Sequence, residues 1–287
     1  SERIARRAFE LAMTRRKKVT AIHKANSFHM TDGLFLESVR HIAQSFPQVQ
    51  LEEMLVDAST AHLVRNPESF DVLVATNFYG DILSDLCSEM SGSLGLAGSV
   101  MASDELCCAQ AQHGSAPTIA GQDLANPTSM ILSVAMMVQW VGDKQGHRAL
   151  RQAGDAMTAA VDAVLANPAT RTPDIGGHIG CKAFAQAVDI PVLCAIPADE
   201  DIRRKSANYQ IIGKPGGQWG SLFAELASNV ASAPPRQPTP LDQDGLLGLF
   251  SPEDTGGNLE LVPATQADMR GGSFEKKPSL EVVYDEV

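Results

Sequence analysis

Apolar residues recur at helical spacing in some segments of the chain and form short β-branched runs in others. Ile4, Ala8 and Leu11 repeat every three or four residues, which predicts an opening helix. Val19–His23 is a short apolar run that predicts a buried strand. The same criteria predict further helices over about 33–46, 58–66, 81–90, 126–141, 147–166 and 182–188, and further strands over about 49–57, 70–76 and 106–110. Strands that alternate with helices predict an α/β fold, in which the loops between them are available for a site.

The periodic pattern ends after about residue 197. Residues 231–240 are rich in proline and predict a linker, and residues 251–287 are polar and poorly periodic. Such a composition buries too little apolar surface to offset the entropy of ordering the chain. We therefore expect most of this tail to be disordered.

Composition and charge exclude several classes of protein. The net charge is −11, so a broad surface for nucleic-acid phosphates is not expected. The longest apolar stretch, Met130–Val141, is too short to span a bilayer, so no membrane association is expected. The five cysteines form no CxxC pair, which favours reduced, buried thiols of an intracellular protein. Adjacent Cys107 and Cys108 would point to opposite faces of a strand, which argues against a shared metal.

Two aspartates at helical spacing give the sharpest chemical signal. Asp81 and Asp85 follow a β-branched strand and open a helix that we expect to begin at Asp81. Their i, i+4 spacing puts both carboxylates on one helix face, close enough to repel unless a cation lies between them. The positive end of the helix relieves part of that repulsion. The spacing indicates either a metal site or a solvated acidic first turn.

A lysine and a third aspartate follow two other predicted strands. Lys24 ends one strand and Asp57 ends another. Functional groups of α/β proteins gather at the carboxyl ends of strands. Three carboxylates and an amine there could hold Mg²⁺ or Mn²⁺, which prefer oxygen ligands. Taken singly, Lys24 is typical of a surface lysine and Asp57 of a helix N-cap.

Four landmarks in register resemble those of the β-decarboxylating dehydrogenases, the family of isopropylmalate, isocitrate, homoisocitrate and tartrate/D-malate dehydrogenases. They are residues 19–26, Val56 with Asp57, residues 77–85, and residues 113–117 with 125–128. Their order and intervals fit from residue 1 to about 190. The resemblance implies an α/β, isopropylmalate dehydrogenase-like sheet-and-helix fold.

The resemblance implies an NAD-dependent, metal-dependent oxidative decarboxylation of a 2-hydroxy acid that carries a β-carboxylate. Asp81 and Asp85, with Asp57 from a partner subunit, would hold Mg²⁺ or Mn²⁺, and Lys24 and Asp57 would be the catalytic pair, with Lys24 relaying protons. Asn26 would lie near the nicotinamide. The remaining cofactor-binding residues implied are those around the adenosine part of NAD: His113, Gly114, Ser115, Ala116, Pro117 and Asn126.

The resemblance also implies a whole N-terminal half that complete enzymes have ahead of the matched region. That half would supply the arginines that bind the substrate and several strands of the sheet. We therefore expect an incomplete fold and little or no turnover by this polypeptide alone. The domains expected are a central, dimerisation domain with the metal and catalytic residues over 1–100, a partial cofactor-binding domain over 101–195, and an extension with a linker and disordered tail over 196–287.

Several alternatives stay open. 3-Isopropylmalate is our first expectation for the substrate and isocitrate the second. Thr118, which follows the Ala-Pro pair, offers no cation for the 2′-phosphate of NADP, and this favours NAD as the cofactor. The alternative function is an inactive fragment or regulatory-type subunit that dimerises with a complete homologue, whereas an active enzyme would form a homodimer. We expect a cytoplasmic protein, or a mitochondrial one if a transit peptide precedes the sequence.

Overall fold

The structure is a computed structural model that describes residues 1–189, 201, 204, 216–232 and 281–284. It divides into two compact units, one with Ser1–Leu96 and the C-terminal end of the chain, the other beginning at Ala97. The first unit contains α1 (Glu2–Met13), β1 (Lys18–His23), α2 (Thr31–Ala43), β2 (Gln50–Leu55), α3 (Val56–Arg65), β3 (Val72–Ala75), α4 (Asn77–Ser91) and β6 (Glu281–Tyr284). The second contains β4 (Gly98–Ala102), β5 (Cys107–Ala111), α5 (Thr128–Gln145), α6 (Arg148–Ala166), α7 (Cys181–Ala187) and α9 (Gly220–Ser232).

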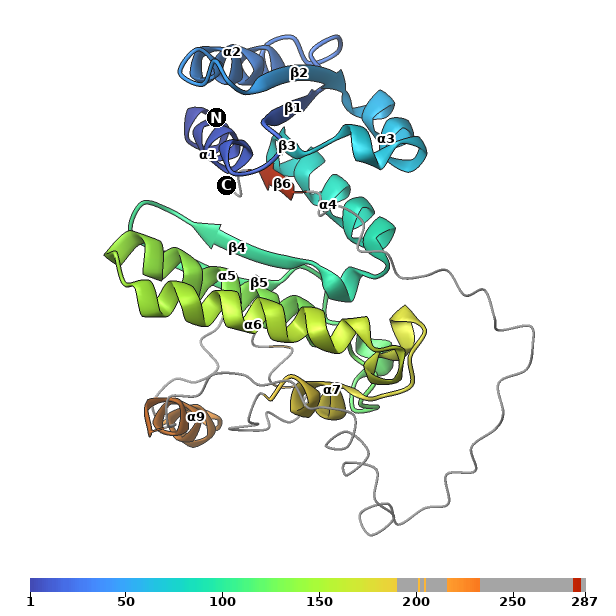
Figure 1. Ribbon diagram of the computed structural model, residues 1–287, viewed down its shortest axis with the longest axis vertical. Coiled ribbons are helices and arrows are strands. Elements are labelled where there is room, and N and C mark those ends of the chain that lie inside the picture. Colours follow the sequence, from blue (N-terminus) through green and yellow to red (C-terminus); the bar gives the residue numbers. More distant parts are fainter. Residues whose placement is uncertain (190–200, 202–203, 205–215, 233–280, 285–287) are drawn as a thin grey trace, which may run out of the picture. The chain divides into compact units, whose positions relative to one another are not determined.

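The first unit is built on a parallel sheet with the strand order β2-β1-β3-β6 (Figure 1). Helices cover both faces, so the central strand β3 is apolar on both sides and all four of its residues are fully buried. Side chains alternate along it because successive residues of a strand point to opposite faces. Val72 and Val74 pack with α1 and α2, and Leu73 and Ala75 pack with α3 and α4.

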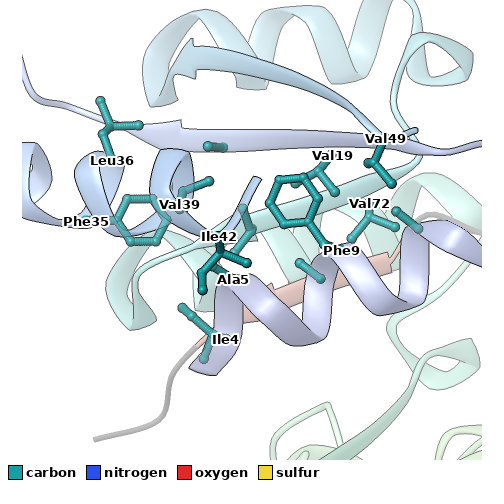
Figure 2. Packing of buried hydrophobic residues seen from close by; sticks show 14 residues of the cluster. Ile4, Ala5, Phe9, Val19, Phe35, Leu36, Val39, Ile42, Val49 and Val72 are labelled. Carbon is teal, nitrogen blue, oxygen red and sulfur yellow. The ribbon is translucent and has the colours of Figure 1, made fainter. Parts of the chain in front are cut away.

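The larger core cluster lies between the sheet and the helices α1 and α2. Phe9 of α1 points toward Val19 of β1 and Val72 of β3 (Figure 2). Its ring stacks on Phe46, with 5.5 Å between the ring centroids. The apolar residues that recur at helical spacing at the start of the chain thus form the buried face of α1.

A buried carboxylate joins the turn before β1 to the start of β3. Asp71 is 1% exposed and accepts hydrogen bonds from Arg15 Nε at 2.9 Å and from the backbone N–H of Arg16 at 2.8 Å. Arg16 also donates to the carbonyl of Phe70. These bonds fix where the two parallel strands begin relative to one another.

The second unit packs the antiparallel pair β4–β5 against α5, and α6 lies along α5 (Figure 1). Ser133 of α5 binds both strands, since its Oγ accepts from the Ser99 N–H at 2.9 Å and donates to the Gln110 carbonyl at 2.7 Å. Gly154 lets the two helices approach closely. A Cβ built there would lie 2.5 Å from the side chain of Gln139 and 2.7 Å from the Ala135 carbonyl.

Most of the expected elements are present with shifted ends. The shift that bears on the site is in α4, which begins at Asn77, four residues before the expected start at Asp81. The helix expected over 126–141 begins at Thr128 and runs to Gln145, and Asn126 caps it from outside by accepting the Thr128 N–H at 3.0 Å. Among the described helices, none is both long and apolar enough to cross a membrane.

Most of the tail that we expect to be disordered lies outside the described residues, so that expectation stays a prediction. Within the described part beyond residue 196, Gly220–Ser232 forms a helix and Glu281–Tyr284 forms a strand paired to β3. The expectation of buried cysteines needs correction. The described cysteines are free as expected, but none is fully buried: Cys108 is exposed and the others are half-buried. Cys107 and Cys108 alternate between half-buried and exposed along β5, as opposite faces require. Cys194 lies outside the described residues.

Candidate functional site

Three adjacent parallel strands deliver the candidate residues of the first unit. Lys24 directly follows β1, Asp57 lies in the first turn of α3 after β2, and Asp81 lies in α4 after β3. Because β2, β1 and β3 are neighbours and run parallel, their carboxyl ends share one edge of the sheet. This is the edge where open α/β sheets place their ligands.

The structure brings Lys24 and Asp57 together. Lys24 Nζ lies 2.8 Å from Asp57 Oδ1 within the same chain. The hydrogen bond from Lys24 lowers the pKa of the Asp57 carboxyl, and nearby backbone amides lower it further. Asp57 is not the N-cap of α3, because that position belongs to Leu55. The carboxylate is therefore left to face solvent and the amine.

A buried aspartate that the sequence reasoning did not single out holds this arrangement. Asp32, in the first turn of α2, is 5% exposed and accepts the backbone N–H of Lys24 at 2.6 Å. The phenol of Tyr79, near the start of α4, lies close enough for the charge of Asp32 to act on it. Burial, and then the charge of Asp32, raise the pKa of Tyr79 to about 12. One carboxylate thus holds the turn of Lys24 by a hydrogen bond and acts through its charge on Tyr79, in the helix of Asp81 and Asp85.

The signal that could have revealed Asp32 is its place in the segment Thr31-Asp32-Gly33-Leu34-Phe35. An acidic residue in the first turn of a helix is common, because the positive end of the helix favours it. Its burial follows from the packing of α2 against the sheet, which a single sequence does not disclose.

Asp81 and Asp85 are both solvent-exposed and lie in the middle of α4. The dipole argument weakens for them, because the helix begins at Asn77 and the effect fades beyond the first turn. Their i, i+4 spacing still puts two carboxylate ligands of the type that Mg²⁺ and Mn²⁺ accept on one face. Within the described part of a single chain, no three acidic, histidine or cysteine side chains gather as metal ligands. The metal site expected from the sequence is therefore not assembled by the described residues of one chain.

The candidate cofactor residues are divided between the two units. Asn26 lies exposed in the turn after β1. His113, Gly114, Ser115, Ala116 and Pro117 form a loop in the second unit whose last four residues are exposed. In that loop His113 Nδ1 lies 2.9 Å from the Gly114 carbonyl, and Ala116 has the positive φ of 41°. Asn126 is 7% exposed, and its amide donates to Asp174 Oδ2 at 3.0 Å.

Comparison with known proteins adds a family to this geometry. The family model described as isocitrate/isopropylmalate dehydrogenase matches residues 1–188. The isocitrate/homoisocitrate dehydrogenase of Thermus thermophilus is 45% identical over 189 residues, which is 66% of this chain and 54% of that protein. A probable mitochondrial NAD isocitrate dehydrogenase subunit alpha of Drosophila melanogaster is 42% identical over 189 residues, 66% of this chain and 48% of that protein.

A solved structure agrees with these relatives. The crystal structure of isocitrate dehydrogenase from Methylococcus capsulatus superposes with a TM-score of 0.57 at 39% identity, over 63% of this chain and 52% of that one. The chain thus spans about half the length of the curated relatives it matches. The fold expected from the sequence is confirmed by this similarity.

A protein of another description matches as well. The chlorophyllide reductase 35.5 kDa chain of Cereibacter sphaeroides is 64% identical over 105 residues, which is 37% of this chain and 32% of that protein. The dehydrogenase family model does not extend into residues 189–287.

Proposed function

This chain belongs to the isocitrate/isopropylmalate dehydrogenase family, and we propose that it supplies the metal-binding and catalytic part of an NAD-dependent, β-decarboxylating 2-hydroxy-acid dehydrogenase. The observation that carries the proposal is the set of three neighbouring strand ends that bear Lys24, Asp57 and Asp81. The ion pair between Lys24 and Asp57 supports it further. The substrate class is a 2-hydroxy acid with a β-carboxylate, of the 3-isopropylmalate or isocitrate type.

Lys24 is the proton-carrying residue in this proposal. Its ammonium forms an ion pair with Asp57 at the carboxyl ends of the strands. Asp32 holds the backbone of Lys24 in place by accepting its N–H. A lysine that is only 24% exposed can exchange a proton with a substrate oxygen while the carboxylate beside it keeps the side chain in place.

Asp81 and Asp85 are the proposed ligands of Mg²⁺ or Mn²⁺. Because the described residues of one chain gather no third ligand beside these two, Asp57 of a second subunit would complete the set. The ion, when bound, polarises the oxygen atoms of the substrate and stabilises negative charge that develops on them. Residues 113–117 and Asn126 would bind the adenosine part of NAD, and Asn26 would bind near the nicotinamide.

A complementation assay tests the proposal. A complete relative, inactivated at its own lysine that matches Lys24, is mixed with this chain, and NADH formation from 3-isopropylmalate and isocitrate is followed. We expect turnover only in the mixture, because this chain brings Lys24 and Asp57 to the site of its partner. The matched control is the same mixture with Lys24→Ala in this chain, which should be inactive. A mixed dimer that forms on sizing but shows no turnover would contradict the proposal.

The half-length match supports a second candidate, an inactive or regulatory-type subunit that pairs with a complete homologue. The same assay separates the two. A regulatory subunit would change the activity of a complete relative that is itself active. It would not restore activity to a relative inactivated at its lysine. A catalytic subunit would restore the inactivated one.

The chlorophyllide reductase match supports a proposal of its own. Residues 1–188 match dehydrogenases, so we assign most of the 105-residue match to the region beyond residue 188. The chain would then join two segments of different ancestry. Intact-mass measurement of the protein from its natural source should find both segments on one polypeptide, and two separate polypeptides would refute the assignment.

A further inference from the structure

The edge of β3 that faces away from β1 requires a neighbour. All four residues of β3, Val72–Ala75, have 0% exposure, and one edge of the strand pairs with β1. Without a strand on the other edge, unpaired backbone N–H and C=O groups would line an apolar strand, which is a template for pairing with another chain.

β6 fills that edge from the far end of the sequence. It pairs parallel to β3 in the register Val72 with Glu281, Leu73 with Val282, Val74 with Val283 and Ala75 with Tyr284. Valine and tyrosine are residues that favour strands. The side chain of Val283 packs against the core cluster between the sheet and the helices α1 and α2. The strand therefore contributes both backbone pairing and core contact.

The origin of this strand is unexpected for a dehydrogenase sheet. The family model matches residues 1–188, and β6 lies more than ninety residues beyond that region. A segment outside the family match thus completes the sheet on which the candidate residues Lys24, Asp57 and Asp81 are mounted.

We propose that residues 281–284 are a built-in sheet-completing strand, which closes the β3 edge within the same chain and prevents that edge from pairing with another extended chain. The pairing is an intramolecular form of β-strand addition, in which main-chain hydrogen bonds give the affinity and alternate side chains give the specificity. This proposal does not depend on the dehydrogenase activity.

The test uses the full chain with Val283→Asp, which puts a charge against an apolar cluster. The matched control is Val287→Asp, which adds the same charge three residues beyond the strand. Hydrogen exchange of the peptide that contains Val72–Ala75 is followed by mass spectrometry. We expect exchange in this peptide to become at least tenfold faster in Val283→Asp and to stay unchanged in Val287→Asp. Equal exchange rates in the two variants and the wild type would overturn the proposal.

A second measurement covers the case in which Val283→Asp fails to fold. The chain is ended after Leu280, and a synthetic peptide of residues 278–287 is added in excess. We expect the peptide to restore slow exchange at Val72–Ala75 and to reduce aggregation, while a peptide with the Val283→Asp change does neither. Wild-type protection that is lost on dilution would show that the strand comes from a second copy, and would overturn the intramolecular assignment.

Discussion

Asp32 offers the sharpest test of how the candidate site is held. Its carboxylate, 5% exposed, accepts the Lys24 N–H at 2.6 Å and the Thr31 hydroxyl at 3.2 Å, and its charge acts on the phenol of Tyr79. Asp32→Asn keeps the shape but turns one acceptor into a donor, so either the Lys24 amide or the Thr31 hydroxyl then faces a donor. Loss of a buried hydrogen bond to a charged group costs about 1.5–3 kcal/mol, which is the expected fall in the free energy of unfolding.

The same substitution should lower the pKa of Tyr79. That pKa stands at about 12, raised above 10.0 by burial first and by the charge of Asp32 next. Asp32→Asn removes the charge but leaves Tyr79 buried, so we expect a Tyr79 pKa between 10 and 12. Absorbance of the tyrosinate, read within seconds of a jump to alkaline pH, measures it. Because the chain has three tyrosines, Tyr79→Phe identifies which transition belongs to this residue.

A control substitution and a clear failure complete this test. Asp104→Asn removes an equal charge from an exposed position in the other unit and should leave the stability and the pKa of Tyr79 unchanged. A Tyr79 pKa that stays near 12 in Asp32→Asn, with unfolding free energy within about 0.5 kcal/mol of the wild type, would refute the linking role of Asp32.

Two further predictions concern charge. Arg40 pairs with Glu53 at 2.6 Å and lowers the pKa of the Glu53 carboxyl. Because Arg40 is half-exposed, Glu53→Gln should lower the free energy of unfolding by under about 1 kcal/mol at pH 7. Because the Glu53 pKa is lowered in the folded state, its contribution to stability is present above the ordinary value of 4.5 and is lost as the pH falls through the folded value. Urea unfolding should therefore find a difference between the wild type and Glu53→Gln at neutral pH and none in acid. Thr118→Asp should tighten NAD in calorimetric titration of the complemented enzyme, because a carboxylate can accept from the ribose hydroxyls; unchanged affinity would place Thr118 outside the cofactor site.

The elements were predicted well where the apolar residues follow a single helical or strand spacing along the whole element. The strands that end at His23, Leu55 and Ala75 and the α/β fold followed from apolar runs and the helices between them. The start of α4 was predicted wrongly at Asp81, whereas Thr76 is the N-cap and Gly80 lies inside the helix. A glycine inside a helix costs only about 1 kcal/mol, which packing against the sheet offsets.

The candidate site was predicted in part. The meeting of Lys24 and Asp57 was expected from their places at strand ends, and the ion pair agrees with that placement. Asp32 and Tyr79 were missed because their role depends on burial between α2 and α4, which no local pattern encodes. β6 was missed because three residues that favour strands, after a long polar segment, carry too weak a signal against the surrounding composition.

Binding of Mn²⁺ tests the central claim most directly, namely that Asp81 and Asp85 hold a divalent ion. Electron paramagnetic resonance of free Mn²⁺ is followed during titration with the full chain in its assembled state, with Asp81→Asn, Asp85→Asn and the exposed control Asp104→Asn compared. The account predicts that each of the first two variants weakens Mn²⁺ binding tenfold or more and that the control binds as the wild type does. Equal binding in all four proteins, or no binding in any, would contradict it.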